Sequence, residues 1–410
     1  MRTDIKWRSN LLSNNTTNVL ILGAGYGGSV VANTLARELR KEIARDELEI
    51  TILDKSGTFI NQAGFTFIPF DLFTPEELIM PRKKLISPRV NAFYGEDGEV
   101  TNVDLKKREV TVKSNKKYNY DYLVIALGCQ AAPEKTPGLL DDYNTFFTTL
   151  EDTYKLKEKL MNFDKGRVVI SVANYPIPCS GAPVKFSFMY DSYLRHVKNK
   201  RKDIEIAVAW PIEGIGPPEF NKFVSGELEK KEIELHRNFI TTKVDANKKE
   251  ITSERGETLK YDLLISVPPQ KTNPVLIKSG IADSKGWVPA DTTSLQYKGP
   301  NGIDKNVFVI GDSGDASILK TGIATHYQAV TVSQTLFNMI KGYNIIKPYY
   351  GKAGCPMITE LETAFTDGRG YIPTWKYNQP NEAYKTTRLG WYIYRMYYHL
   401  HWEMSVKGMF

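Results

Sequence analysis

The chain has 410 residues, too many for one ordinary hydrophobic core, so we expect two or three domains. Hydrophobic residues make up 41% of the sequence and charged residues 25%, values that indicate a folded globular protein and exclude a disordered chain. The net charge of +7 fits ordinary solubility, with attraction to anionic lipid or to a small anion as the alternative. Nucleic-acid binding is not expected, because no cluster of Lys and Arg is interleaved with aromatic residues in a known module.

The sequence also limits membrane insertion, export and metal binding. No window reaches the roughly 18 consecutive apolar residues of a transmembrane helix. Residues 1–18 are polar and lack the apolar core of a signal peptide, so we expect a disordered leader there. The three cysteines are too few for a disulfide scaffold and too scattered for a structural zinc site, and no metal is expected. They are either inert core thiols or a small redox set.

Residues 18–54 predict a strand, a glycine-rich turn, a helix over 29–47 and a second strand that ends at Asp54. The turn, residues 23–28, reads Gly-Ala-Gly-Tyr-Gly-Gly and matches the dinucleotide-binding fingerprint. Both flanking strands and the terminal acid are in place, which favours a dinucleotide site over a glycine-rich turn without a ligand.

Each glycine of this fingerprint, and the acid that follows it, has a physical role. Gly23 permits the tight turn, Gly25 lets the backbone approach a pyrophosphate, and Gly28 lets the helix pack close to the strand. The N-terminus of the helix then faces the phosphates. Asp54 is placed to bond a ribose hydroxyl.

Three later segments predict strands that end at a sheet edge. Residues 120–128 end in Gly128, residues 261–269 end in two prolines, and residues 306–312 end in Gly311-Asp312. A carboxylate at the carboxyl end of a strand lies where ligands of open α/β folds bind. Asp312 can also cap the next helix, and the two roles are compatible.

The middle of the chain repeats the architecture without the fingerprint. A strand over 167–172, a helix over 183–197 and a strand over 204–210 predict a second dinucleotide-type fold. Where its glycine turn belongs, residues 173–179 read Ala-Asn-Tyr-Pro-Ile-Pro-Cys. Prolines and a tyrosine cannot form the tight turn or admit a pyrophosphate closely, so we predict that this half does not bind NAD(P)H.

Several motifs together carry a resemblance to a known family. They run in the family's order from about residue 18 to the C-terminus and comprise residues 125–128 (IALG), 178–185 (PCSGAPVK), 266–269 (SVPP), 286–288 (GWV), 306–312 (NVFVIGD), 320–321 (KT), 354–359 (GCPMIT) and 406–410 (VKGMF). The chain resembles the flavin-dependent sulfide:quinone oxidoreductases, in the branch that includes the animal mitochondrial enzyme. That family lies within the two-dinucleotide-fold disulfide reductases.

The resemblance implies non-covalent FAD, peripheral (monotopic) membrane attachment and a redox disulfide between Cys179 and Cys355. In the implied mechanism hydrosulfide attacks the disulfide, Cys355 keeps the added sulfur as a persulfide, and Cys179 leaves as a thiolate facing the flavin. Electrons pass through a thiolate–flavin complex to FAD and then to a membrane quinone. The sulfur goes to a small thiol, to sulfite or to a growing polysulfide. A disulfide is electrophilic at sulfur and hydrosulfide is a good nucleophile, so the exchange needs no metal.

The family also suggests further flavin contacts, from Gly128, Gly311 and Asp312. In the superfamily a lysine at the position of Lys320 approaches the pyrimidine edge of the flavin, where it stabilises negative charge on the reduced ring. An ordinary surface lysine is the alternative. Thr321 and Gly322, at the following helix start, are placed to present backbone N–H groups to the same edge.

Two other residues receive weaker assignments. Cys129 is interpreted as a small packing residue, because free cysteine is often buried. His326 is a candidate proton relay to the quinone, although the animal branch has no histidine there.

The tail over residues 384–410 is rich in aromatic residues and leaves little polar surface. It is too short and too aromatic to span a bilayer, and it predicts an interfacial helix with its rings at headgroup level. Burial against the core or a partner subunit is the alternative. Ile358, Phe365 and Tyr371 are candidate walls of a quinone pocket open to lipid.

The expected fold is α/β, with two Rossmann-like domains and a C-terminal membrane-association module. We predict an FAD domain from two segments (17–160 and 286–345), a degenerate nucleotide domain (161–285) carrying Cys179, and a C-terminal module (346–410) carrying Cys355. The rivals are a type II NADH:quinone oxidoreductase, a sulfide dehydrogenase that reduces a cytochrome, and a non-catalytic flavin-binding sensor or assembly protein. Homo-oligomerisation is left open.

Overall fold

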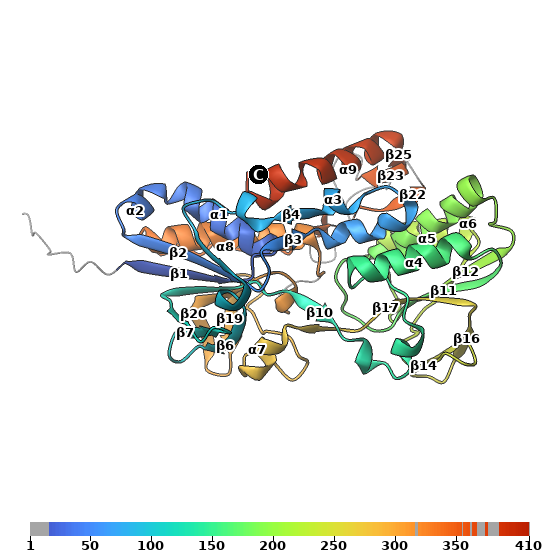
Figure 1. The fold of residues 1–410 in the computed structure, drawn as a ribbon, viewed down its shortest axis with the longest axis horizontal. Helices are drawn as coiled ribbons and strands as arrows, with labels where there is room; N and C mark the ends of the chain where they lie inside the picture. The colour runs from blue at the N-terminus through green and yellow to red at the C-terminus, as the bar shows by residue number, and fades with distance from the viewer. Residues whose placement is uncertain are drawn as a thin grey trace, which may run out of the picture.

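The computed structural model describes residues 16–315, 319–354, 356–360, 363–366, 374–375 and 385–409, with the side chains of all but 363–366, 374–375 and 385–386. Two α/β halves lie side by side along the long axis of the molecule (Figure 1). The C-terminal helix α9 lies across the top of both in the same view, above their junction. The mixed α/β class predicted from the sequence is confirmed.

A six-stranded sheet forms the first half. Its strands lie in the order β19 (Gln296–Gly299), β20 (Gly302–Val309), β9 (Tyr122–Ile125), β1 (Thr17–Leu22), β2 (Leu48–Asp54) and β5 (Asn91–Tyr94). All neighbours pair in parallel except β19 with β20. The central strands carry runs of buried apolar residues, such as 19–22 in β1 and 123–125 in β9, because segments cover both faces of a parallel sheet.

Two helices pack together against this sheet, and both begin at its carboxyl edge. They are α1 (Tyr26–Glu38) and α8 (Gly322–Ile340). The predicted helix over 29–47 is broken once, because Leu39 leaves the helical region at φ −107° and ψ 28° and α2 (Arg40–Ala44) follows it. The apolar face of the prediction is kept, since Val30, Val31 and Leu35 are all buried.

A four-stranded parallel sheet forms the second half. Its strands lie in the order β13 (Ile233–His236), β12 (Ile204–Ala209), β11 (Gly166–Val172) and β17 (Leu263–Val267). The helices α4 (Leu150–Asn162), α5 (Ala182–Tyr193) and α6 (Pro218–Lys230) belong to this half. The repeated strand–helix–strand pattern read from the sequence is therefore present twice.

Shorter elements connect and cover these halves. The antiparallel pieces are β3 (Thr58–Ile60) with β4 (Ile79–Pro81); β6 (Val100–Asp104), β7 (Glu109–Val112) and β8 (Lys117–Asn119); β10 (Cys129–Ala131) with β18 (Gln270–Thr272); and β14 (Thr241–Asp245), β15 (Glu250–Ser253) and β16 (Thr258–Lys260). The short helices are α3 (Pro75–Leu78) and α7 (Pro274–Lys278). The β10–β18 pair crosses between the two halves below their junction (Figure 1).

The C-terminal part returns over both halves. It contains β21 (Ala353–Gly354), β22 (Ile358–Glu360), β23 (Thr363–Thr366), β24 (Thr374–Trp375), β25 (Lys385–Thr387), α9 (Arg388–Leu400) and the π-helical turn η9 (His401–Val406). Thr387 caps α9 by accepting a hydrogen bond from the backbone N–H of Gly390. No helix in the described part of the chain combines the length and apolar character needed to cross a bilayer.

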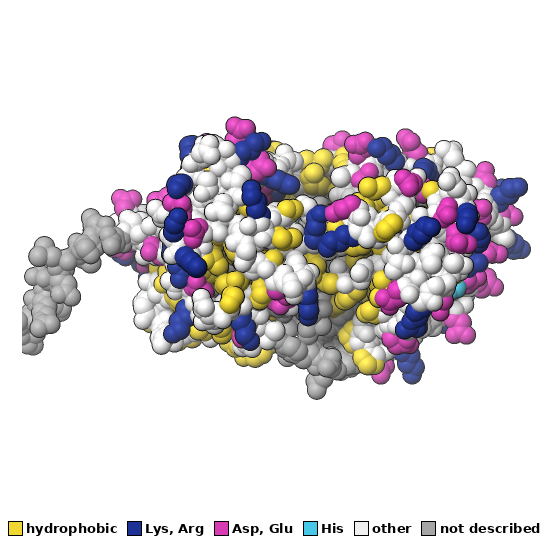
Figure 2. Space-filling model, turned by 90° about the horizontal axis from the view of Figure 1, so that it is seen from below, with side chains coloured by type: hydrophobic (Ala, Val, Ile, Leu, Met, Phe, Trp, Pro, Cys, Tyr) yellow, Lys and Arg dark blue, Asp and Glu magenta, His cyan; other side chains and the backbone are white. Residues whose placement is uncertain are grey.

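On the face shown in Figure 2, charged side chains are spread over both halves and do not form a single patch. Figure 2 shows the molecule from below, and on the described residues of this face Lys and Arg alternate with Asp and Glu over both halves. This distribution favours the interpretation of the net charge as ordinary solubility on this face.

Candidate active site

The glycine turn between β1 and α1 has the shape that a dinucleotide pyrophosphate requires. Gly23 adopts φ +95°, and a Cβ there would lie 2.4 Å from the carbonyl oxygen of Ala126. A Cβ on Gly28 would lie 1.9 Å from the carbonyl oxygen of Gly23, so neither position accepts a side chain. Gly25 faces open space, with nothing within 4 Å of a Cβ built there. No side chain caps the helix at Gly25, so its first N–H groups remain available to an anion.

Asp54 ends β2 beside this turn, as predicted, but it already has protein partners. Its carboxylate accepts hydrogen bonds from the backbone N–H groups of Ala24, at 2.7 Å, and Ser56, at 2.9 Å. Arg82 lies 3.4 Å from the same carboxylate and also donates to the carbonyl of Ala24. Burial lowers the pKa of Arg82 against the opposing effect of Asp54. A carboxylate has lone pairs for a further hydroxyl, so a ribose contact stays compatible with these bonds.

Arg82 was not singled out by the sequence, because it belongs to no motif and comes from a 3₁₀ turn far along the chain. Its guanidinium is 10% exposed and fixes Ala24, in the glycine turn, relative to Asp54. A buried arginine that bonds Ala24 of the turn and the adjacent Asp54 holds the turn in one conformation.

Asp312 and Lys320 meet at the carboxyl edge of β20. The Oδ1 atom of Asp312 is buried and has no hydrogen-bond partner within the described residues. Lys320 is 5% exposed, and its Nζ donates to the carbonyls of Asp312, at 3.1 Å, and Gly314, at 2.5 Å. The ammonium also lies 3.9 Å from the ring centroid of Trp287, a cation–π distance.

Burial shifts the pKa values of this pair toward the neutral forms. It raises the pKa of Asp312, which the neighbouring Lys320 opposes, and it lowers the pKa of Lys320 against the attraction of Asp312. Surface exposure of Lys320, the alternative in the sequence analysis, is therefore wrong. Among the described residues the buried Asp312 oxygen has no hydrogen-bond partner, so this edge can accept a polar group of a ligand.

Thr321 and Gly322 form the start of α8 next to Lys320. The Thr321 hydroxyl accepts a hydrogen bond from the N–H of Ala324 at 3.0 Å and so caps the helix. Gly322 has open space around it, with nothing within 4 Å of a Cβ. Gly311 adopts φ +67°, and its N–H donates to Gln328 at 2.7 Å. The glycine turn, the Asp312 oxygen and this helix start thus offer polar contacts that suit a flavin cofactor.

Cys179 lies in the segment that replaces the second glycine turn, between β11 and α5. Its backbone N–H donates to the carbonyl of Lys320, and Pro178 pairs with Lys320 in a parallel bridge. Cys179 adopts φ +49°, a left-handed conformation uncommon for a residue with a side chain. Three residues later α5 begins, so the sulfur lies near a helix N-terminus, which stabilises a thiolate.

The replaced turn borders a small cavity of about 130 Å³. Its lining residues are Lys135, Asn174, Tyr175, Pro176, Pro269, Gln270, Lys285 and Trp287. Three of them belong to the segment that stands where a glycine turn would hold a pyrophosphate, and the Tyr175–Pro176 peptide is cis. The absence of NAD(P)H binding stays a prediction.

Cys355 and Tyr371 lie outside the described residues, and of Phe365 only the backbone is described, in β23. The residues on either side of Cys355 are placed. Ala353 and Gly354 form β21, and β22, which begins at Ile358, packs against α5. Ile358 is fully buried in the hydrophobic cluster against which Cys179 packs.

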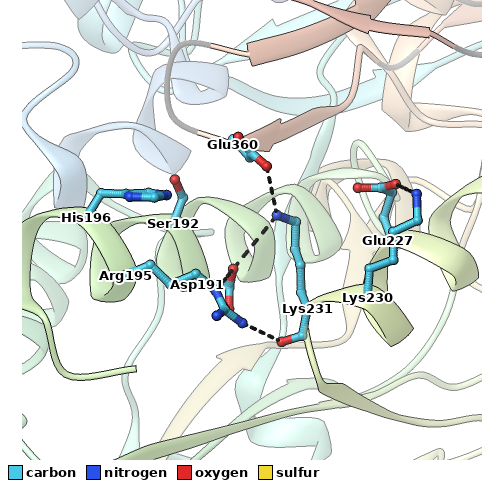
Figure 3. A pocket seen from close by; sticks show the side chains of 8 residues that line it. All are labelled: Asp191, Ser192, Arg195, His196, Glu227, Lys230, Lys231 and Glu360. Atoms are coloured by element: carbon cyan, nitrogen blue, oxygen red, sulfur yellow. Dashed lines mark hydrogen bonds and ion pairs between the residues drawn. The ribbon is translucent and has the colours of Figure 1, made fainter. Parts of the chain in front are cut away.

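A charged cluster also joins α5 to β22 (Figure 3). The Asp191 carboxylate is fully buried and accepts from Arg195 Nε at 3.0 Å and Arg201 Nε at 2.6 Å. Lys231 lies 3.8 Å from Asp191 and 3.6 Å from Glu360 on β22. A cavity of about 220 Å³ lies beside these groups. The cluster ties the helix that follows Cys179 to the strand that follows Cys355.

Two further predictions concern Cys129 and His326. Cys129 begins β10, its thiol lies 3.8 Å from Gln270 Oε1, and burial raises its pKa well above the ordinary value. His326 lies on α8, and burial lowers its pKa. His326 and His401 lie close to the ring of Tyr26 in the glycine turn, with centroid distances of 6.1 and 5.2 Å. His401 was not assigned a role from the sequence, since only the tertiary structure brings the C-terminus to this turn.

The C-terminal helix has two apolar faces. Its inner face buries Trp391, Tyr394 and Tyr398 in the core of the second half. Its outer face exposes Leu389, Tyr392, Met396 and Leu400, which are 67%, 63%, 56% and 39% exposed. One face of the helix is thus buried, as in the alternative interpretation of the tail, while the interfacial location of the other face stays a prediction.

Comparisons with known proteins agree with this geometry. The sequence profile of the family described as pyridine nucleotide-disulphide oxidoreductase matches residues 17–171. The chain is 27% identical, over 96% of its length and 87% of the relative's, to the mitochondrial sulfide:quinone oxidoreductase of Mus musculus.

Two solved structures share the fold. The sulfide:quinone oxidoreductase of Aquifex aeolicus superposes with a TM-score of 0.78 at 19% identity, covering 96% of this chain and 92% of that one. NDH2 of Plasmodium falciparum, solved with NADH, superposes with a TM-score of 0.67 at 13% identity, covering 96% of each chain. The fold is therefore shared by a sulfide:quinone oxidoreductase and by a protein solved with NADH, so the fold alone does not identify the electron donor.

Proposed function

We propose that the chain is a sulfide:quinone oxidoreductase, within the pyridine nucleotide-disulphide oxidoreductase family whose profile matches residues 17–171. One observation carries the proposal: Cys179 stands where the second nucleotide turn belongs, and its backbone is bonded to the carbonyl of Lys320. A thiol is thereby fixed next to the flavin edge in place of a nicotinamide. The similarity to the Mus musculus enzyme, which extends over nearly the whole chain, supports the same reaction.

We propose FAD as the form of the flavin. The turn at Gly23, Gly25 and Gly28 supports pyrophosphate binding, and Asp54 the ribose. Gly128, Gly311 and Asp312 are the proposed contacts to the rest of the cofactor, the last because its buried Oδ1 atom awaits a donor. Bound FAD would accept two electrons from sulfur and deliver them to a membrane quinone.

The sulfur chemistry is proposed to run on a disulfide between Cys179 and Cys355. Hydrosulfide attacks the Cys355 sulfur, the Cys179–Cys355 bond breaks, and a new S–S bond makes Cys355 a persulfide. Cys179 leaves with the electron pair as a thiolate at the N-terminus of α5, which favours that charge. The packing of β22 on α5 supports this pairing, because it brings the segment that follows Cys355 against the helix that follows Cys179.

Lys320 is proposed as the residue that stabilises negative charge on the reduced ring, together with the N–H groups of Thr321 and Gly322 at the start of α8. Its burial and its two carbonyl contacts fix the position of the ammonium. In a site of low polarity such a fixed charge interacts more strongly than in water. The persulfide sulfur is then transferred to a nucleophilic acceptor, for which a small thiol, sulfite or a polysulfide has the required chemistry.

We further propose that the outer face of α9 binds the membrane surface peripherally. Leu389, Tyr392 and Met396 leave apolar area in water that an interfacial location would cover. Met396→Asp is expected to lower recovery of the protein with anionic lipid vesicles by several-fold in a flotation assay. Equal flotation of the wild type and the variant would contradict membrane binding through this face. Ile358, Phe365 and Tyr371 remain proposed walls of the quinone pocket.

The nearest rival is a type II NADH:quinone oxidoreductase, which shares the fold. It requires a second turn that admits a pyrophosphate, and the Tyr175–Pro176 segment with its small cavity does not resemble one. A sensor or assembly protein that binds flavin without turnover is the rival outside catalysis.

One experiment separates these candidates. The purified protein is mixed anaerobically with sulfide and, separately, with NADH, while the flavin spectrum is recorded. We expect sulfide to bleach the flavin through a long-wavelength charge-transfer band and NADH to leave it unchanged. Bleaching by NADH alone would move the protein to the NADH:quinone class, and no bleaching by either donor would favour the sensor.

A further inference from the structure

A series of hydrogen bonds connects the inner face of α9 with Lys185 in the first turns of α5. Lys185, Tyr394 and Tyr398 are 3%, 5% and 9% exposed. The Lys185 ammonium donates to the Tyr394 oxygen at 3.2 Å, and Tyr394 donates to the Tyr398 oxygen at 3.2 Å. Tyr398 in turn donates to the carbonyl of Ala63 at 3.3 Å. Because the last acceptor is a carbonyl, the direction of these bonds is fixed, and Tyr394 presents its oxygen to the ammonium.

This series of hydrogen bonds lies in apolar surroundings, where charges interact strongly. The ring of Tyr398 contacts Phe67 and Phe73, with centroid distances of 5.3 and 5.1 Å. The Lys185 ammonium also lies 5.2 Å from the centroid of the Tyr394 ring. A buried ammonium is costly without such partners, so the two α9 tyrosines hold it in a defined place.

Lys185 and Cys179 lie at the same end of α5 and both border the α9 tyrosines. Lys185 is the fourth residue of α5, and long side chains in a helix lean toward its N-terminus, where Cys179 lies. Both residues act on the same hydroxyl: burial raises the pKa of Tyr398, Lys185 lowers it, and Cys179 contributes a smaller increase. Cys179 also packs against the hydrophobic cluster that contains Tyr394 and Tyr398.

We propose that Lys185, held by Tyr394 and Tyr398, is a positioning residue that stabilises the thiolate of Cys179. The C-terminal helix is then part of the sulfur site and not only a surface anchor. The inference rests on the proposed function in taking Cys179 as the redox sulfur, but thiolate stability is measurable without turnover. Among the described residues, the titratable groups linked to Cys179 are Tyr398, whose pKa Cys179 raises, Lys185 and Tyr394 in the same hydrogen-bonded network, and Lys320, whose carbonyl accepts the Cys179 N–H.

The test uses the full-length protein with FAD bound and Cys355→Ser, so that Cys179 stays a thiol. The rate of alkylation of Cys179 by iodoacetamide is followed from pH 5 to 10 by peptide mass spectrometry. Only the thiolate reacts, so the rate of alkylation rises with pH around a midpoint that reports the pKa of Cys179. K185M is expected to raise this midpoint by about one pH unit, because the thiolate loses a nearby cation. Y394F is expected to raise it by about half as much, because the ammonium loses an acceptor that holds it.

Matched variants guard against a purely structural effect. K185R keeps the charge and is expected to restore most of the low midpoint. Y392F removes a hydroxyl from the exposed side of the same helix, where the residue is 63% exposed, and is expected to leave the midpoint unchanged. An unchanged midpoint in K185M, or equal midpoints in Y394F and Y392F, would overturn the inference. Neither result affects sulfide-driven bleaching of the wild-type flavin, whose failure would instead remove the proposed function.

Discussion

The two halves of the molecule contain the same strand–turn–helix unit, but the turns differ in their residues. Between β1 and α1 the turn is made of glycines, and Gly25 leaves the space in front of the helix open. Between β11 and α5 the equivalent turn contains Tyr175, two prolines and Cys179, and its backbone is tied to Lys320. A helix N-terminus favours negative charge in both places, so a phosphate suits the first and a thiolate suits the second.

The comparison shows that the scaffold fixes where a ligand can bind and the turn decides which one. Loss of a few glycines removes the backbone cradle without disturbing the sheet, since β11 keeps its parallel register with β12 and β17. The N-terminus of α5, which follows this turn, still favours a negative charge, here on Cys179. In the second half ion pairs surround Asp191 of α5, and in the first half Tyr26 of α1 stacks on His401.

The second turn gives the largest expected effect. We expect Cys179→Ser to lower the rate of flavin reduction by sulfide by at least about 1000-fold, because a serine can neither form the disulfide nor leave as a thiolate. Flavin content should stay normal, as the first turn is untouched. The measurement is anaerobic stopped-flow absorbance. Cys129→Ser is the control, and a comparable loss there would contradict the assignment of the sulfur site to the second turn.

The ionic anchor of the second half is the next test. Asp191→Asn leaves Arg195, Arg201 and Lys231 around an uncharged amide, and we expect the free energy of unfolding to fall by about 3–5 kcal/mol. Glu360→Gln breaks a contact whose carboxylate is 55% exposed and should cost at most about 1 kcal/mol. Urea unfolding measures both variants. Equal losses would mean that the buried carboxylate contributes no more than a surface ion pair.

The first turn is tested by filling its open space. Gly25 has extended backbone angles that valine accepts, and a Cβ there contacts nothing within 4 Å. Gly25→Val should therefore fold but bind flavin at least about 100-fold more weakly, because its side chain occupies the place of the pyrophosphate. Flavin absorbance and the melting temperature of the apoprotein are measured together. Gly226→Val, in open space on α6, is the control and should purify with its flavin.

The smallest expected effect concerns the stacking that covers the first turn. His401 is 7% exposed, and burial lowers its pKa to about 4. The unfolded chain binds a proton below about pH 6.5 and the folded protein does not, so stability present above that pH is lost as the pH falls toward 4. The loss from this residue should reach about 2 kcal/mol at pH 5.

Two variants isolate the contribution of His401. His401→Phe keeps a ring against Tyr26 and should flatten the fall in melting temperature between pH 7.5 and 5. His399→Gln changes an exposed histidine on the same helix and should follow the wild type. If His401→Phe loses stability with acid as steeply as the wild type, protonation of His401 is not the cause.

Much of the first turn was readable from the sequence because its requirements are local. The roles of Gly23 and Gly28 follow from backbone approaches of 2.4 and 1.9 Å that a side chain would forbid, and such positions leave glycines at fixed spacing. The Gly311-Asp312 edge was predicted from another local pattern, a strand that ends in Gly-Asp. The expected domain boundaries, the pairing of Cys179 with Cys355 and the quinone residues stay predictions.

Other parts of the site depend on contacts that no local pattern records. Arg82 bonds Asp54 and the glycine turn from a distant 3₁₀ segment, and His401 stacks on Tyr26 across nearly the whole chain. Nothing at these positions distinguishes them from ordinary surface residues in the sequence. The aromatic tail was expected to lie at a membrane, but its sequence could not show that one face is buried.

The sequence by itself determined that the α/β unit occurs twice, that its first turn has the glycines of a dinucleotide site and that its second turn lacks them. Residue spacing and turn chemistry act within a few residues, so they can be read locally. Only the tertiary structure decided which charges surround the sulfur. It places Lys185 of α5 against Tyr394 of α9, residues more than 200 positions apart, and buries them together. Burial and partners depend on how elements pack, and packing is a property of the whole chain.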